Sequence, residues 1–166
     1  MPNIHQQIFI ATTAEKVYEA LTTQAGLSAW WTPNTTAVPE EQTIARFTFG
    51  NGYYKEMEVT KLKHPHLVEW LCVYGADEWI GTSISFTIQF GTREKLLAEH
   101  AELSDQLHQS SADRGSVLIF HHNNWKEYSS MFAECSYTWS RFLRSLKLYC
   151  ETADGTPWPT QHAVEN

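Results

Sequence analysis

A long run of aromatic and apolar residues near the C-terminal end is the feature that most constrains how this chain folds. Within Ser129–Glu151, apolar residues recur at steps of three and four: Met131, Cys135, Trp139, Phe142, Leu146 and Tyr149. This spacing is typical of an amphipathic helix with one continuous apolar stripe. A strand-like run, Gly115–Trp125, comes directly before it. The stripe requires a surface to cover it, and a sheet that grips one long helix often encloses a cavity.

Strand-like segments fill much of the chain before this helix. In Trp79–Phe90, Ile84, Phe86 and Ile88 alternate with polar residues, which predicts a half-buried strand of a sheet with one wet face. The same reasoning predicts a sheet of six strands, which are Ile4–Ile10, Thr43–Phe49, Tyr54–Lys63, Leu67–Tyr74, Trp79–Phe90 and Gly115–Trp125.

Helical segments interrupt the strands at two places. Two helices, Ala14–Thr22 and Gln24–Trp31, are predicted after the first strand, and the following stretch Asn34–Gln42 is expected to be a loop. The second interruption covers about residues 92–113, where Leu96, Leu103 and Leu107, with His100 between them, return to helical spacing. Three roles remain open for this insertion: local packing on the edge of the domain, a lid over the cavity mouth, or a dimer contact.

The chain is predicted to form one domain over residues 1–152, followed by a loosely ordered tail over 153–166. With 42% hydrophobic residues it can bury a large core, and its net charge of −7 argues against nucleic acid as a partner. No segment reaches the ~18 apolar residues that a membrane span requires. The cysteines Cys72, Cys135 and Cys150 lack paired spacing and the N-terminus lacks a basic leader, so a cytoplasmic location is expected.

The chain lacks the short motifs of nucleotide-binding proteins, α/β-hydrolases and zinc proteases, and we predict no catalytic residue, metal ligand or cofactor. A hairpin turn explains His64 and His66 better than a metal site does. His122 faces inward if Leu118 and Phe120 do, because alternate residues of a strand share a face. Two readings stay open for His122: a histidine held by hydrogen bonds at a strand end, or a contact to a ligand.

Several motifs along the chain carry a resemblance to a known family. They are VYEALTTQAGLSAWW at Val17–Trp31, FGNGYYKEMEV at Phe49–Val59, VEWLC at Val68–Cys72, WIGTSISFTI at Trp79–Ile88, FHHNNW at Phe120–Trp125 and CSYTWSRFLRSLKLY at Cys135–Tyr149. In this order they resemble the START-like helix-grip superfamily, also called SRPBCC. Within it, the chain is most similar to the family named after the C-terminal domain of the activator of the ninety-kilodalton heat-shock chaperone ATPase.

Two features depart from the family pattern. The insertion replaces a short turn between the last two strands, and Asn123-Asn124 stands where relatives commonly have a Ser-Gly pair. The resemblance implies an α+β fold of the helix-grip (START/Bet v-like) type, a curved antiparallel sheet around the long C-terminal helix with a cavity between them.

We therefore expect the cavity to be lined by inward-facing residues of sheet and helix: Phe47, Trp70, Thr82, Ile84, Phe86, Phe120, His122, Cys135, Trp139 and Leu143. Core packing explains the aromatic members of this set equally well. The predicted function is non-enzymatic binding of a hydrophobic small molecule or lipid. The alternatives are a chaperone-associated adaptor that uses the outer surface, as the family name implies, and a cyclase- or hydrolase-type enzyme acting on an apolar substrate. A homodimer and a chaperone are the candidate protein partners.

Overall fold

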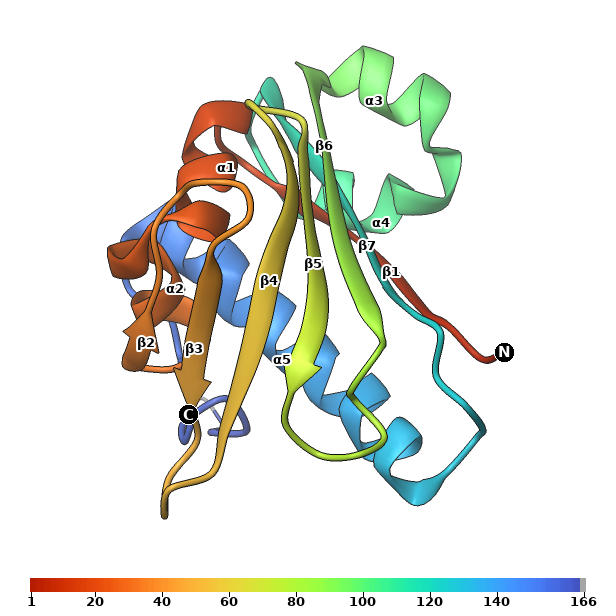
Figure 1. The fold of residues 1–166 in the computed structure, drawn as a ribbon. Helices are drawn as coiled ribbons and strands as arrows, with labels where there is room; N and C mark the ends of the chain where they lie inside the picture. The colour runs from red at the N-terminus through yellow and green to blue at the C-terminus, as the bar shows by residue number, and fades with distance from the viewer. Residues whose placement is uncertain (165–166) are drawn as a thin grey trace.

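The computed structural model describes residues 1–164. Seven strands form one antiparallel sheet in the order β1-β7-β6-β5-β4-β3-β2, which curls around the long helix α5 (Figure 1). The strands are β1 (Ile4–Ile10), β2 (Asn34–Thr36), β3 (Ile44–Thr48), β4 (Tyr54–Lys63), β5 (Leu67–Tyr74), β6 (Ser83–Thr92) and β7 (Arg114–Asn123). The helices are α1 (Ala14–Thr22), α2 (Gln24–Trp30), α3 (Arg93–Glu99), α4 (Ser104–His108) and α5 (Ser130–Thr152), with a 3₁₀ turn η1 at Ala101–Leu103. The predicted helix-grip arrangement is confirmed.

The sheet has one strand more than the six predicted. The extra strand, β2, lies in the stretch expected to be a loop and pairs antiparallel with β3, Thr35 opposite Phe47. Its three residues are too few for alternation to show in the sequence. Thr35 is buried there, and its hydroxyl donates a hydrogen bond of 2.7 Å to the carbonyl of Thr32, which satisfies the buried polar group.

The strand predicted to begin at Trp79 begins instead at Ser83. The residues before it form a turn, in which the Thr82 hydroxyl donates to the carbonyl of Trp79 at 2.6 Å. Gly81 has a φ of 88°, a conformation that favours glycine and breaks the extended run. The turn folds Trp79 inward, where its side chain is buried beside the strand it was expected to belong to.

The long helix α5 buries the second half of the predicted stripe. Trp139, Phe142 and Leu146 are buried against the sheet and α2, whereas Met131 near the start of the helix is 38% exposed. Ser129 caps the helix, since its side chain accepts a hydrogen bond of 3.1 Å from the backbone N–H of Phe132. The helix therefore grips the sheet along its C-terminal part and leaves its first turns at the rim.

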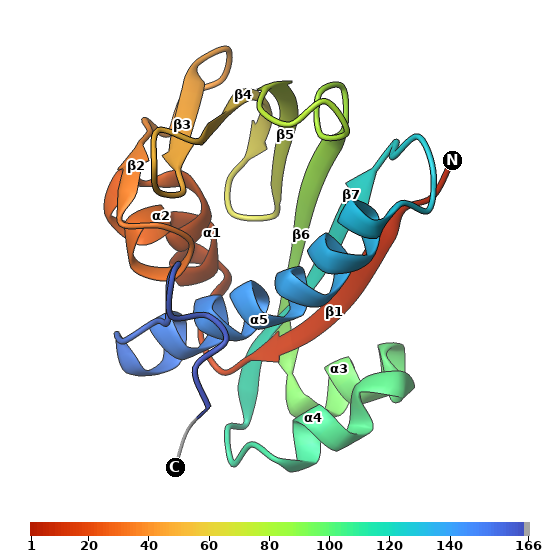
Figure 2. The same ribbon diagram turned by 90° about the horizontal axis from the view of Figure 1, so that it is seen from below.

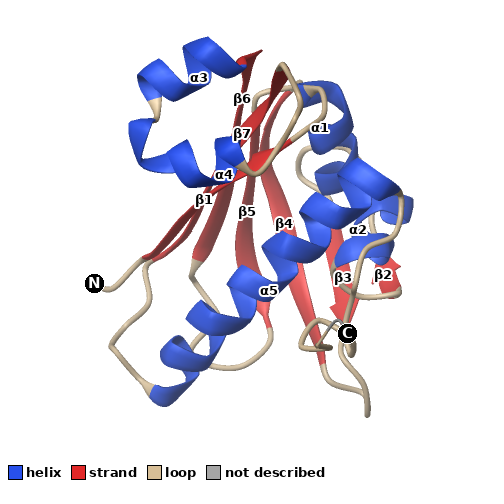
Figure 3. Cartoon of the chain, turned by 180° about the vertical axis from the view of Figure 1, so that it is seen from behind, coloured by secondary structure: helices blue, strands red, loops and turns tan. Residues whose placement is uncertain are grey.

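The insertion lies on the face of the sheet opposite to α5 (Figures 2 and 3). Leu96, Leu103 and Leu107 form a separate apolar cluster with Phe9 of β1 and Val117 of β7, which face away from α5. In this position the insertion does not cover a cavity between the sheet and α5, so the structure does not support the lid, one of the three roles left open. Local packing, the first of the three roles, is what the structure shows.

The segment after α5, expected from its sequence to be loosely ordered, makes specific contacts with the domain. The backbone N–H of Thr156 donates to the Ser145 hydroxyl at 2.7 Å, and that of Trp158 donates to the carbonyl of Trp31 at 2.8 Å. The Trp158 ring packs edge-on against Phe49 with ring centroids 6.1 Å apart. Residues 153–164 thereby run back along the open side of the grip, next to α2.

Candidate functional site

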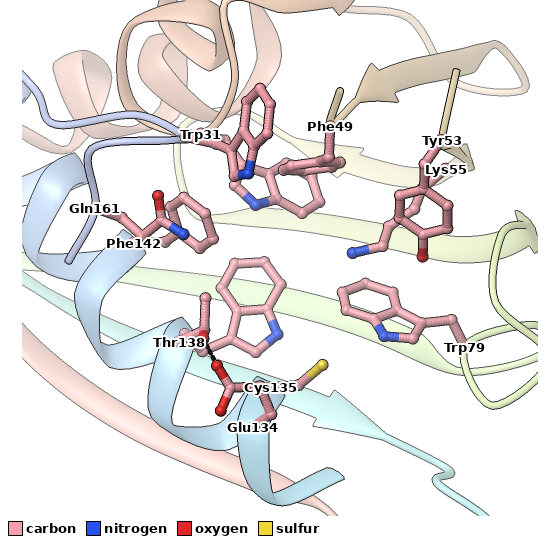
Figure 4. Close-up of a pocket in the computed structure, with 12 residues that line it drawn as sticks. Trp31, Phe49, Tyr53, Lys55, Trp79, Glu134, Cys135, Thr138, Phe142 and Gln161 are labelled. Atoms are coloured by element: carbon pink, nitrogen blue, oxygen red, sulfur yellow. Dashed lines mark hydrogen bonds between the residues drawn. The ribbon is translucent and has the colours of Figure 1, made fainter. Parts of the chain in front are cut away.

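A cavity of about 200 Å³ lies between the sheet, α5 and the segment after α5 (Figure 4). Its wall is formed by Trp31, Phe49, Tyr53, Lys55, Trp79, Glu134, Cys135, Thr138, Trp139, Phe142, Trp158 and Gln161. A larger groove of about 370 Å³ runs along the outside of α1 and the end of α5, but Lys16, Glu19 and Glu151 line it. The cavity inside the grip is the better candidate because its wall is mostly aromatic, as in sites that bind small apolar ligands.

Trp31, at the end of α2, forms the back wall of the cavity. Its ring stacks on Trp70 of β5 with centroids 5.8 Å apart and an angle of 11° between the planes. Phe47 of β3 and Trp139 of α5 contact the same ring at 4.3 and 5.2 Å. Rings at these separations attract each other beyond the area they bury. These three neighbours of Trp31 belong to strands and a helix, so regular secondary structure supports the back wall.

Among the described residues, Lys55 is the one cation in the wall, and β4 places it there. It shares a face of the strand with Met57 and Val59, which are buried in the core. Its Nζ lies 3.6 Å from the centroid of the Trp79 ring and 4.7 Å from that of Phe49. Figure 4 shows the side chain reaching inward with its nitrogen next to these rings. The arrangement is a cation–π site at the edge of an apolar cavity.

Burial lowers the pKa of Lys55 to about 8, and the nearby Cys135 and Cys72 thiols offset this only in part. Water solvates the ammonium poorly in this position, which disfavours its charged form. Burial also raises the pKa of the Cys135 thiol and of the Tyr53 hydroxyl. Both groups are consequently neutral near pH 7.

Polar groups at the opposite end of the cavity come from α5 and the following segment. Gln161 lies across the cavity from Lys55 (Figure 4), and its Oε1 is buried without a hydrogen-bond partner in the described part of the chain. Glu134 is exposed at the rim and accepts a hydrogen bond of 3.3 Å from the hydroxyl of Thr138. The cavity thus combines aromatic walls with a cation at one end and an unpaired acceptor at the other.

His122 is buried behind this cavity and has protein partners on both ring nitrogens. Trp139 donates its indole N–H to Nδ1 at 3.1 Å, and Nε2 lies 2.8 Å from the Thr82 hydroxyl oxygen. An indole nitrogen can only donate, so Nδ1 accepts and the proton of the neutral ring resides on Nε2. Burial, together with the charge of Lys55, lowers the pKa of His122 to about 3. This arrangement corresponds to the first of the two interpretations of His122, a histidine held by hydrogen bonds at a strand end.

Two of the ten expected ligand-binding residues, Cys135 and Trp139, line the cavity. The others are buried in the main core and do not line it: Phe47, Trp70, Thr82, Ile84, Phe86, Phe120, His122 and Leu143. Phe47 and Trp70 support the wall from behind through Trp31. Lys55 was not predicted from the sequence as a site residue. Lys55, Met57 and Val59 alternate along the strand, and this spacing indicates that they share its inward face.

The fold and cavity define a protein of the helix-grip class, and comparison with known proteins gives the family. The family described as activator of Hsp90 ATPase homolog 1-like protein matches residues 11–151. The chain belongs to this family. No curated protein matches it.

Solved structures share the fold along nearly the whole chain. The Aha1 dimer from Colwellia psychrerythraea is 31% identical with a TM-score of 0.73, and the alignment covers 93% of this chain and 100% of that one. A protein from Staphylococcus saprophyticus is 15% identical, with a TM-score of 0.64 and coverage of 93% and 95%. One from Mesorhizobium loti is 13% identical, with a TM-score of 0.66 and coverage of 88% and 94%. Among the described residues, no helix is both long enough and apolar enough to cross a membrane.

Proposed function

We propose that this protein binds a compact hydrophobic small molecule in the cavity between the sheet and α5, without catalysing a reaction on it. The observation that carries the proposal is the aromatic cavity of about 200 Å³. An apolar cavity of ~150 Å³ in another protein accommodates benzene, so this volume suits a ligand of one or two rings. Its walls belong to packed elements, which lowers the entropic cost of binding.

Binding is preferred over catalysis because the titratable groups at the cavity do not form an acid–base pair. His122 lies behind the cavity wall, is neutral, and is held on both nitrogens by Trp139 and Thr82. A general base must reach a substrate proton directly or through one water. The enzyme alternative therefore has less support from this arrangement than simple binding does.

Isothermal titration with benzamide and 2-naphthamide, two neutral aromatic probes, tests the proposal. Cys135→Trp projects a large ring into the cavity and should abolish binding, whereas the matched change Ser140→Trp lies on the exposed side of α5 and should leave it intact. Trp31, Trp79, Trp139 and Trp158 line the cavity, so the intrinsic fluorescence should change on binding. The proposal fails if neither probe binds, or if Cys135→Trp binds both probes as tightly as the wild type.

A second candidate function rests on the family to which the chain belongs. The family's name refers to an Hsp90 ATPase activator, and the similar structure from Colwellia psychrerythraea is described as a dimer. Association with such a chaperone through the outer surface, and formation of a homodimer, are accordingly part of this proposal. Stimulation of a purified Hsp90 ATPase and light scattering after size exclusion test the two statements separately. The cytoplasmic location stays a proposal that is supported by the three free cysteines.

A further inference from the structure

We infer that the ligand of this cavity carries a carboxylate or a similar anionic group, which Lys55 binds. The inference rests on the proposed function and adds the chemical class of the ligand. It concerns one atom, the Nζ of Lys55, which Figure 4 shows directed inward beside Phe49 and Trp79. An aromatic acid of one or two rings would place its ring system among the tryptophans and its charge at this nitrogen.

The ammonium of Lys55 has no counter-ion in the part of the chain that the structure describes. Within residues 1–164 it forms no hydrogen bond and no ion pair, and its nitrogen instead makes cation–π contacts with the rings of Phe49, Tyr53 and Trp79. A buried charge is costly unless it is paired, and cation–π contacts offset only part of that cost. An anionic ligand in the cavity would neutralise the charge of the Lys55 ammonium, which the described residues leave without a counter-ion.

The groups that face Lys55 from the neighbouring elements do not compete for this role. Cys72 of β5 and Cys135 of α5 are neutral near pH 7, because burial raises the pKa of Cys72 to about 11 and raises that of Cys135 as well. Tyr53, just before β4, is also neutral, since burial raises its pKa. His122 is uncharged at pH 7, since burial lowers its pKa to about 3.

Two carboxylates lie near the cavity, and among the described residues neither forms an ion pair with Lys55. Glu134 at the rim accepts from Thr138, and Glu78 in the turn before β6 accepts from the hydroxyl of Ser129 at 2.5 Å. The positive end of the cavity is therefore open to a ligand anion.

The other end of the cavity sets the orientation of such a ligand. Gln161 presents there a buried Oε1 that has no hydrogen-bond partner among residues 1–164, and this oxygen can accept from a ligand donor but cannot bond to a carboxylate oxygen. The acid group is consequently expected at Lys55, and the ring against Trp31 and Phe142, which contact each other edge to face in the wall.

A matched pair of probes, 2-naphthoate and 2-naphthamide, separates charge recognition from shape. The two molecules have nearly the same size, and only the first is anionic at pH 7. Isothermal titration of the wild type and Lys55→Met should show that the variant loses about tenfold in affinity for the naphthoate. Its affinity for the naphthamide should stay within about twofold, which also shows that the variant keeps the cavity.

The pH dependence of binding gives a measurement on the unaltered protein. Because the pKa of Lys55 is lowered to about 8, the wild type should hold naphthoate equally well from pH 6 to 7.5 and progressively less above pH 8. Naphthamide binding should not change over this range, and neither should naphthoate binding by Lys55→Met.

The outcomes distinguish the two proposals. If both probes bind the wild type but Lys55→Met affects them equally, or neither depends on pH, the anion inference is overturned while binding in the cavity stands. If neither probe binds the wild type, the proposed function itself fails.

Discussion

Trp139 of α5 donates its indole N–H to Nδ1 of His122 on β7, at 3.1 Å and fully inside the core. The bond crosses the interface between the gripped helix and the sheet. On the far side of the imidazole, Nε2 donates to the Thr82 hydroxyl, which in turn donates to the carbonyl of Trp79. One chain of hydrogen bonds therefore fixes the helix, the last strand and the turn that carries part of the cavity wall.

Removing the indole donor should destabilise the protein. In Trp139→Phe the His122 Nδ1 stays buried without a partner, a loss that costs about 1–3 kcal/mol in addition to the smaller ring. The free energy of unfolding, measured with urea, checks the size of the effect. A double-mutant cycle with His122→Leu should give a coupling energy of about 0.5–3 kcal/mol between the two side chains. Strictly additive effects would contradict a direct bond.

His122 should also make the stability depend on pH. Its pKa is about 3 in the folded protein against an ordinary value of 6.5, so the unfolded chain binds more protons on this residue between those values. The free energy of unfolding should accordingly fall as the pH drops from 6.5 toward 3, by up to ~1.4 kcal/mol per pH unit from this residue alone. Above pH 6.5 the contribution is complete and constant.

Urea titrations at pH 7, 6, 5 and 4 measure this slope, and a variant isolates the histidine from the acidic residues. His122→Gln should lower stability at pH 7 yet show a flatter dependence on pH below 6. His108→Gln, on the exposed side of α4, is the control and should keep the wild-type slope. Equal slopes in all three proteins would show that His122 titrates normally.

The helix and most strands of the grip were predictable from the periodicity of the sequence, and their arrangement was implied by the resemblance to the helix-grip superfamily. Three- and four-residue steps identify α5, and the alternation of Ile84, Phe86 and Ile88 identifies β6. The short strand β2 was not predictable, since three residues carry no period. The sequence also did not predict which face of the sheet the insertion covers. Phe9 and Val117 form an apolar patch on that face, but this follows only from the register of β1 and β7.

The cavity depends on contacts between segments that are far apart in the chain. Trp158 reaches the wall through a backbone hydrogen bond to Trp31, and no local pattern near Pro157 and Pro159 indicates it. An inward-facing residue of a strand is packed in the core where the helix lies close to it, and it lines the cavity where the helix lies farther away. Phe86 and Phe120 are therefore core residues here, whereas Lys55 reaches the cavity beyond the point where α5 packs closely.

The position of the segment after α5 should depend on the absence of a side chain at Gly155. A Cβ atom at this position would lie 2.4 Å from the carbonyl oxygen of Ala29, a backbone atom that cannot move aside easily. Gly155→Ala should therefore displace the segment, release Trp158 from the wall, and destabilise the protein by about 1–3 kcal/mol through overpacking. Affinity for 2-naphthamide should fall as well, because one wall of the site is lost.

Gly91→Ala is the matched control, since a Cβ there would meet Leu96 at an ordinary 3.5 Å. It should change the free energy of unfolding by no more than about 0.5 kcal/mol. Limited proteolysis after residue 152 and Trp fluorescence report whether the segment has left its position. If Gly155→Ala matches Gly91→Ala in stability, cleavage rate and naphthamide affinity, residues 153–164 do not form a wall of the site. A faster cleavage with unchanged affinity would instead place the ligand deeper, against Trp31 and Trp139 alone.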